Sequence, residues 1–195
     1  MMTKTEFLHR FQLQELSKST HDYQYHSDLK SAAVLIPILE KQLNNNSTQL
    51  NILFTKRAEH LKHHGGQVSF PGGKAEHYDD TLISTAIREA QEEIGLQIDT
   101  IEIVGQLHPY QTISGYIVTP IIAFITAEQE FIIDHNEVAE IFQVPLHHFL
   151  NTDNHHSFNV RQKNIHHQIH FMPYQHYNIW GATAAMLKDL TTHLG

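Results

Sequence analysis

The chain has 195 residues, of which 13 are basic and 21 acidic, and its formal net charge is −8. This length suits one domain, and a hydrophobic content of 41 % is enough to form a buried core. A chain this acidic has no general attraction for nucleic acid or for an anionic membrane surface, so both are excluded as partners. A local basic pocket for a small anion stays open.

The chain contains no cysteine, which excludes disulfides and thiol catalysis. Its first residues lack the apolar run of a signal peptide. The longest apolar stretches, "AAVLIPIL" and "YIVTPIIAFI", are much shorter than the roughly 20 residues that a membrane helix needs. The sequence therefore predicts a cytoplasmic protein that acts on a small molecule, and it leaves a homodimer open.

Helical and strand-like segments interleave along residues 1–195, which we expect to form a single domain. Several strands are joined by short turns, so an α/β fold with a mixed sheet between helices is expected. Helices are predicted at about 3–17, 81–95, the end of 136–150 and 180–194. Strands are predicted at 31–39, 50–57, 98–107, 115–125, the start of 136–150, and as a hairpin within 157–174, with turns or loops at 44–49 and 63–73.

The clearest helix is "TLISTAIREAQEEIG", residues 81–95. Asp79 and Asp80 precede it as candidates for the N-terminal cap, and Gly95 is placed to end it. Its apolar stripe is formed by Leu82, Ile83, Ala86, Ala90 and Ile94.

Three glutamates crowd one face of this helix, namely Glu89, Glu92 and Glu93. Like charges at such spacing destabilise an isolated helix by roughly 0.2–0.5 kcal/mol per pair. Hard divalent cations prefer oxygen ligands, and carboxylates at i, i+3 and i+4 supply them. Arg88 can reach Glu92 one turn away. The alternative is a solvated acidic face without a ligand.

Eight of the 18 histidines form four scattered doublets, at 63–64, 147–148, 155–156 and 166–167. His166 and His170 share one face of a predicted strand but have no third ligand beside them, so we interpret the histidines as surface composition. Their titration would make the net charge sensitive to mild acid.

The segment "REAQEEIGL" (88–96) resembles the second half of the Nudix box, G-x5-E-x7-R-E-U-x-E-E-x-G-U, where U is a bulky apolar residue. The first half departs from it. Gly73 lies 15 positions before Arg88, one more than the general box asks, and the middle glutamate is replaced by Asp79 or Asp80.

The upstream segment "LFTKRAEHLKHHGGQVSFPGG" (53–73) resembles a motif of the coenzyme A diphosphatase branch of that family, L-L-T-K-R-S/A…L-R…G-x3-F-P-G-G. Lys62 stands where arginine is usual, which keeps the charge but loses the fork geometry. The downstream segments "GYIVTPIIAFI", "NEVAEIFQVPL" and "WGATA" are also similar to this branch, so the resemblance covers roughly residues 30–190.

The resemblance implies an α/β/α sandwich and a hydrolase dependent on Mg²⁺ or Mn²⁺. Its substrate would be coenzyme A or a thioester, cut to 3′,5′-ADP and a 4′-phosphopantetheine. Glu89 and Glu93 are the preferred metal ligands and Glu92 the next, with the carbonyl of Gly73 or Gly72 completing the shell.

One further group must accept the proton of the attacking water, and Glu89, Glu92 and Glu137 remain the candidates. Arg88 would hold a carboxylate or the loop in place. The residues expected to bind the anionic substrate are Lys56, Arg57, Lys62 and Gly72. Alternatively, the basic residues are strand-end charges that pair with nearby acids.

Two rival functions stay open. One is a Nudix hydrolase for another nucleoside diphosphate derivative, such as ADP-ribose, NADH or a dinucleoside polyphosphate. The other is a non-enzymatic sensor with the same fold, which would have no need of Arg88, Glu89, Glu92 and Glu93.

Overall fold

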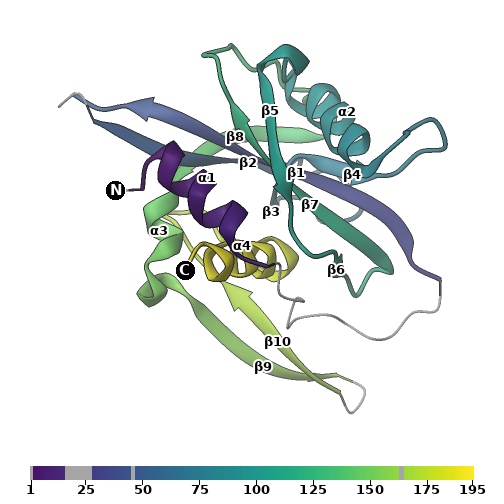
Figure 1. The fold of residues 1–195 in the computed structure, drawn as a ribbon. Coiled ribbons are helices and arrows are strands. Elements are labelled where there is room, and N and C mark those ends of the chain that lie inside the picture. Colours follow the sequence, from purple (N-terminus) through teal and green to yellow (C-terminus); the bar gives the residue numbers. More distant parts are fainter. Residues whose placement is uncertain (1, 16–27, 45–46, 163–164) are drawn as a thin grey trace.

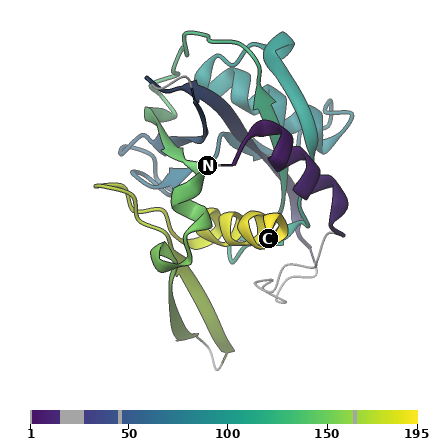
Figure 2. The same cartoon turned by 60° about the vertical axis from the view of Figure 1, so that its left-hand side comes forward.

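The computed structural model describes residues 2–15, 28–44, 47–162 and 165–195. A mixed sheet has helices on both faces, and a two-stranded hairpin projects from this body (Figures 1 and 2). The α-helices are α1 (Lys4–Leu13), α2 (Leu82–Ile94), α3 (Leu146–Leu150) and α4 (Gly181–Leu194), and two 3-10 turns are η1 (Ile98–Thr100) and η2 (Thr152–Asn154).

The main sheet follows the order β3-β2-β1-β7-β5, with β8 added to β2, β4 to β1 and β6 to β7. Strands β1 and β7 run parallel and the other pairs run antiparallel, which confirms the predicted mixed sheet. The strands are β1 (Lys30–Gln42), β2 (Thr48–Arg57), β3 (Val68–Ser69), β4 (Gly72–Lys74), β5 (Ile101–Gln106), β6 (Tyr110–Gln111), β7 (Tyr116–Ile125), β8 (Val138–Pro145), β9 (His156–Gln162) and β10 (Ile165–Phe171).

Strand β1 changes partner along its length. Residues 38–42 pair with β2, whereas residues 32–34 pair with β4. This exchange carries Gly72 and Gly73 into the sheet. A Cβ atom on Gly72 would lie 2.6 Å from the Cα of Val34, so the backbones approach too closely for any larger residue.

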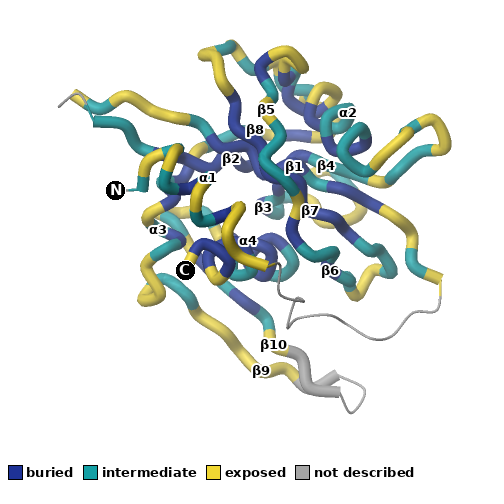
Figure 3. The backbone as a smooth tube through the Cα atoms, in the orientation of Figure 1, coloured by how far each residue is buried: buried dark blue, intermediate teal, exposed yellow. Residues whose placement is uncertain are grey.

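Two apolar clusters pack on the two faces of the sheet. Because strand side chains alternate, Leu35 joins the cluster under α2 and Ile36 joins the cluster under α1, α3 and α4. Figure 3 shows the buried central strands between these layers. The α2 face is therefore separated by the sheet from both ends of the described chain.

Helix α2 begins at Leu82, and the expected capping by Asp79 or Asp80 is wrong. Thr81 is the N-cap, and it exchanges hydrogen bonds with Ser84: the Ser84 N–H donates to Thr81 Oγ1 at 3.1 Å, and the Thr81 N–H donates to Ser84 Oγ at 2.8 Å. The carboxylate of Asp79 is bound elsewhere. Gly95 ends the helix at φ 65°, as predicted.

The other predicted elements are found with shifted ends. Helix α1 stops at Leu13, and residues 16–17 of the predicted helix lie outside the described residues, as do 45–46 of the predicted turn and 163–164 at the hairpin tip. The first residues of the strand expected at 98–107 form η1 instead. No helix in the described part of the chain is long and apolar enough to cross a membrane.

Candidate active site

Arg88 of α2 is fixed to the loop before the helix by a two-pronged ion pair. Its Nε donates to Asp79 Oδ1 and its Nη2 to Asp79 Oδ2, both at 3.0 Å. Asp79 Oδ2 also accepts from the hydroxyl of Thr85 and from the N–H of Glu76. The side-chain bonds from Arg88 hold the pKa of Asp79 well below its usual range. The structure thus selects Asp79, and not Asp80, as the acid of the first half of the motif.

The same guanidinium neutralises two of the crowded glutamates. Arg88 Nη1 donates to Glu89 Oε1 at 2.8 Å and to Glu92 Oε2 at 2.9 Å, the latter contact being the predicted i,i+4 pair. A third bond, from Nη2, reaches the carbonyl of Lys74 at 3.1 Å. The repulsion expected from the helix sequence is therefore largely offset by Arg88.

Glu93 lies on the buried side of α2 and only 2 % of its surface is exposed. Its Oε1 atom lies 3.7 Å from Arg57 Nη1, while its Oε2 has no hydrogen-bond partner among the described residues. Burial raises the pKa of Glu93 to about 8, against the lowering effects of Arg57 and of a backbone hydrogen bond from Gly72. Glu93 is a buried acid with one oxygen left free.

Glu89 interacts with both Arg88 and Glu93: it accepts a hydrogen bond from Arg88, and its charge acts on Glu93. Its carboxylate lies against Gly73 so closely that a Cβ atom there would overlap it. Burial is the main cause that raises the pKa of Glu89, and the charges of Glu92 and Glu137 add to it. Glu137 also raises the pKa of Glu93. This exposed residue, directly before β8, therefore adds a negative charge close to the carboxylates of α2.

The residues expected to bind an anion are divided by the sheet. Arg57 faces α2 through Glu93. Lys56 is paired instead with Glu140 at 3.5 Å and with Glu59 at 4.0 Å, and Glu140 accepts a further bond from the Tyr177 hydroxyl. For Lys56 the structure therefore favours the strand-end pairing that the sequence had left as the alternative.

Two features of the site were missed from the sequence. The exposed ring of Tyr78 lies 5.7 Å from the guanidinium carbon of Arg88, and Thr85 supports Asp79 from within the helix. Both contacts depend on how the loop before α2 folds, which the sequence does not show. In that loop, residue type alone marked only Asp79 and Asp80 as candidates. Lys62 is exposed on the loop that follows β2.

The donor set around Glu93 fits a divalent cation. It offers carboxylate oxygens from Glu89 and Glu93, one of them buried and unpartnered, beside the close-packed backbone at Gly73. Across the described residues, no three acidic or histidine side chains are already grouped around one point. Because Arg88 holds Glu89 and Glu92, a cation would compete with this arginine for their oxygens.

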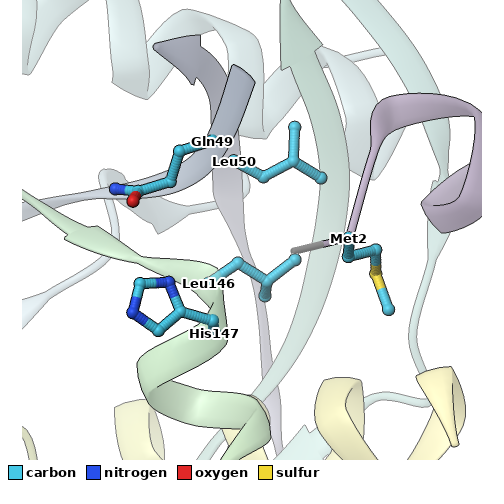
Figure 4. A pocket seen from close by; sticks show the side chains of 5 residues that line it. All are labelled: Met2, Gln49, Leu50, Leu146 and His147. Carbon is cyan, nitrogen blue, oxygen red and sulfur yellow. The ribbon is translucent and has the colours of Figure 1, made fainter. Parts of the chain in front are cut away.

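A small hollow lies away from these carboxylates, on the side of the sheet covered by α1 and α3 (Figure 4). It is lined by Met2, Gln49, Leu50, Leu146 and His147. None of these residues contributes to the carboxylate site.

Residues 30–173 match the family described as the NUDIX domain. A protein named "Uncharacterized Nudix hydrolase NudL" from Yersinia pestis (strain Pestoides F) is 39 % identical over 189 residues, covering 95 % of this chain and 92 % of its own. The protein of that name from Yersinia pseudotuberculosis serotype O:1b (strain IP 31758) gives the same values.

A solved structure of a MutT/nudix family protein from Enterococcus faecalis is similar in fold, with a TM-score of 0.54 and 16 % identity. The match covers 97 % of this chain and 68 % of that one.

Proposed function

The chain belongs to the Nudix hydrolase family and is an enzyme of that family, and on this premise we propose that it is a metal-dependent diphosphatase for coenzyme A or its thioesters. The products would be 3′,5′-ADP and 4′-phosphopantetheine or its acyl form. The observation that carries the chemistry is the buried Glu93 oxygen without a partner, beside Glu89 and Arg57. The segment 53–73 carries the choice of substrate.

We assign the cation, Mg²⁺ or Mn²⁺, to Glu89 and Glu93, with Glu92 and the carbonyl of Gly73 as further ligands. When bound, such a cation neutralises a diphosphate, polarises its phosphoryl oxygens and lowers the pKa of a bound water. Arg88 would orient Glu89 and Glu92 through its two Nη1 bonds. This assignment also explains why a carboxylate is kept in a buried position, where its ionised form is otherwise destabilised.

Glu137 is our choice for the group that accepts the proton of the attacking water. It is exposed, and its charge is close enough to act on both Glu89 and Glu93. Glu92, by contrast, is engaged by Arg88 at 2.9 Å. A base must be free to reach a water beside the reacting phosphorus, and this freedom favours Glu137.

Arg57 is our choice for the group that contacts the diphosphate, because it already lies at the carboxylate site. Lys62, exposed in the same segment, would reach a phosphate further out on the substrate, and Gly72 lets the backbone approach. Lys56 is a weaker candidate because Glu59 and Glu140 compensate its charge.

Comparative turnover tests the substrate class. Purified protein with Mg²⁺ or Mn²⁺ is given coenzyme A, acetyl-coenzyme A, ADP-ribose, NADH and a dinucleoside polyphosphate, and kcat/KM is measured for each. We expect coenzyme A or its thioester to rank first. If it ranks among the poorest, the substrate is another nucleoside diphosphate derivative.

Thermal unfolding tests the cation without any turnover. A ligand that binds only the folded state at about 100 times its Kd stabilises it by roughly 2.7 kcal/mol. We expect Mg²⁺ or Mn²⁺ at millimolar levels to raise Tm of the wild type and to leave Tm of Glu93→Gln nearly unchanged. An equal shift in both proteins would place the cation elsewhere.

A further inference from the structure

The turn at residues 134–137 joins the candidate base to the helix that carries the proposed metal ligands. The N–H of Asp134 donates to the carbonyl of Glu93 at 3.0 Å, and the carbonyl of Asp134 accepts the N–H of Glu137 at 3.0 Å. Two successive backbone hydrogen bonds therefore connect Glu93 to Glu137. Because backbone atoms make both bonds, they do not by themselves explain which side chains the turn needs.

The side chain of Asp134 closes this turn on itself. Its Oδ1 accepts from the backbone N–H of Asn136 at 2.9 Å and from Asn136 Nδ2 at 2.8 Å. Aspartate stabilises tight turns in this way, by hydrogen bonding to the backbone two residues on. The bond to the Asn136 N–H fixes the residue directly before Glu137. The direction in which the Glu137 side chain leaves the backbone therefore depends on the Asp134 carboxylate.

The other side of Glu137 is held by β2 and by an irregularity at the start of β8. The carbonyl of Glu137 accepts the N–H of Ala58 at 2.8 Å. In the ladder of β2 with β8 the register shifts between Lys56 and Arg57, which places a β-bulge next to Glu137. Bulges bend a strand, redirect its side chains and are frequent beside active sites. The Glu137 backbone is thus linked on one side to Glu93 and on the other to the residue after Arg57.

Holding Glu137 at this position is electrostatically unfavourable. Its charge raises the pKa of both Glu89 and Glu93, so three carboxylates repel one another across the site. Asp134 adds a further acid to the same turn. A turn that served only to end α2 would function as well without these charges. Local features that oppose stability in this way are expected where the reaction needs them.

We propose that Asp134 is a positioning residue for the reaction, whose carboxylate holds the turn that places the Glu137 carboxylate beside the carboxylates of α2. This inference rests on the proposed role of Glu137 as the group that accepts the proton of the attacking water. Asp134 accepts no proton in the reaction and acts through the backbone of Asn136 and Glu137. A group displaced by about 1 Å can lose about 100-fold in rate, so the turn should have a measurable effect on kcat.

Steady-state kinetics tests this role, with Mg²⁺ or Mn²⁺ and the substrate that ranks first in the comparison above, whichever it is. Asp134→Ala should lower kcat by roughly 10- to 100-fold and leave KM within a few-fold of the wild type. Asp134→Asn should keep kcat within a few-fold, because its amide Oδ1 accepts the same two bonds. His135→Ala is the matched control, since this exposed side chain of the same turn makes no hydrogen bond within the described part of the chain.

A double-variant cycle separates positioning from a purely structural role. Glu137→Gln should lower kcat by roughly 10²- to 10⁴-fold, the usual contribution of a general base. Because Asp134 acts through Glu137, adding Asp134→Ala to Glu137→Gln should cause no further loss. Two results overturn the inference and leave the base assignment standing: a loss that multiplies in the double variant, or a wild-type kcat in Asp134→Ala while Glu137→Gln is slow.

A wild-type kcat in Glu137→Gln would overturn the assignment of Glu137 as the base and this inference with it, while the ranking of substrates keeps its meaning. If circular dichroism shows that Asp134→Ala fails to fold, Asn136→Ala takes its place, since it removes only the Nδ2 bond at an exposed residue. Asn136→Ala should lower kcat a few-fold in the wild-type background and not at all in Glu137→Gln. Equal losses in both backgrounds, or no loss in either, overturn the inference.

Discussion

Two arginines form ion pairs at α2, Arg88 of the helix with Asp79 of the preceding loop and Arg57 of β2 with Glu93 of the helix, and the two pairs differ in how completely they are satisfied. Arg88 holds Asp79 through two bonds of 3.0 Å, and Asp79 has two further donors. Arg57 lies 3.7 Å from Glu93, and the second oxygen of Glu93 has no partner among the described residues. The first pair is complete within the protein. The second leaves one buried carboxylate oxygen without a partner among the described residues.

We therefore expect the Arg88–Asp79 pair to act on the stability of the fold and the Arg57–Glu93 pair to act on the reaction. The hydrogen bonds that Asp79 accepts lower its pKa and hold the loop before α2 in place. Glu93 is buried with one oxygen unpartnered, so burial raises its pKa, and its ionised form destabilises the folded protein unless a ligand binds.

The largest effect is expected for Glu93→Gln in the incomplete pair. Loss of a metal ligand should reduce kcat/KM on the order of 10³-fold, since the cation contributes several kcal/mol to the transition state. Near pH 7 the metal-free variant should be as stable as the wild type, because Glu93 is then largely protonated and is neutral like the glutamine that replaces it. Activity within a few-fold of the wild type would contradict the role of Glu93.

Asp79→Asn breaks the complete pair and should act on stability. It removes the two charge-assisted hydrogen bonds from Arg88, which keeps Glu89 and Glu92 as counter-charges, so the cost in the free energy of unfolding is about 2 kcal/mol. Urea unfolding measures this, and Asp80→Asn, at the exposed neighbouring position, is the control. Equal stability of the two variants would mean that the Arg88–Asp79 pair contributes little.

The two pairs should also give opposite pH dependence in the metal-free protein. The folded pKa of Glu93 is raised from 4.5 to about 8, so its contribution to stability is lost as pH rises through that window. The folded pKa of Asp79 is lowered from 3.8, so its contribution is lost as pH falls below that value. Urea unfolding with a chelator should therefore show decreasing stability from pH 5 to 8, and Glu93→Gln should remove this decrease.

A smaller effect is expected for Gly73→Ala. The new Cβ would push the Glu89 carboxylate from its place, and a misplaced group costs about 10- to 100-fold in turnover. Gly115→Ala is the control, since it has open space but a φ of 83° and should affect stability alone. If both variants keep wild-type turnover, the closeness of Gly73 to Glu89 has no catalytic meaning.

Much of the fold could be predicted from local patterns. The apolar stripe and Gly95 predicted α2, and alternation with short turns predicted the mixed sheet. The cap was missed because two aspartates just before a helix are strong candidates on residue type, and only the bonds from Arg88 show that Asp79 is already engaged. Residue type predicts what a side chain can bind, while its neighbours decide what it does bind.

Contacts between distant parts of the chain limited how much of the candidate site could be predicted from the sequence. The motif named Arg88 and the glutamates, but the pairing of Arg57 with Glu93 joins positions on two elements that sequence spacing does not relate. Lys56 and Arg57 are adjacent, yet they pair with acids on different elements.

The contact of α1 with α4 has a consequence for how the chain matures. Arg10 Nη1 donates to the carbonyls of Leu194 and Gly195, and the ring of Phe11 packs on His193. Helix α1 precedes α4 by about 170 residues, so at about 5–20 residues per second it is synthesised roughly 8–34 s before its partner. During that interval Phe11 lacks the cover that His193 gives it in the folded protein, so α1 is exposed to association with other chains until α4 has been made.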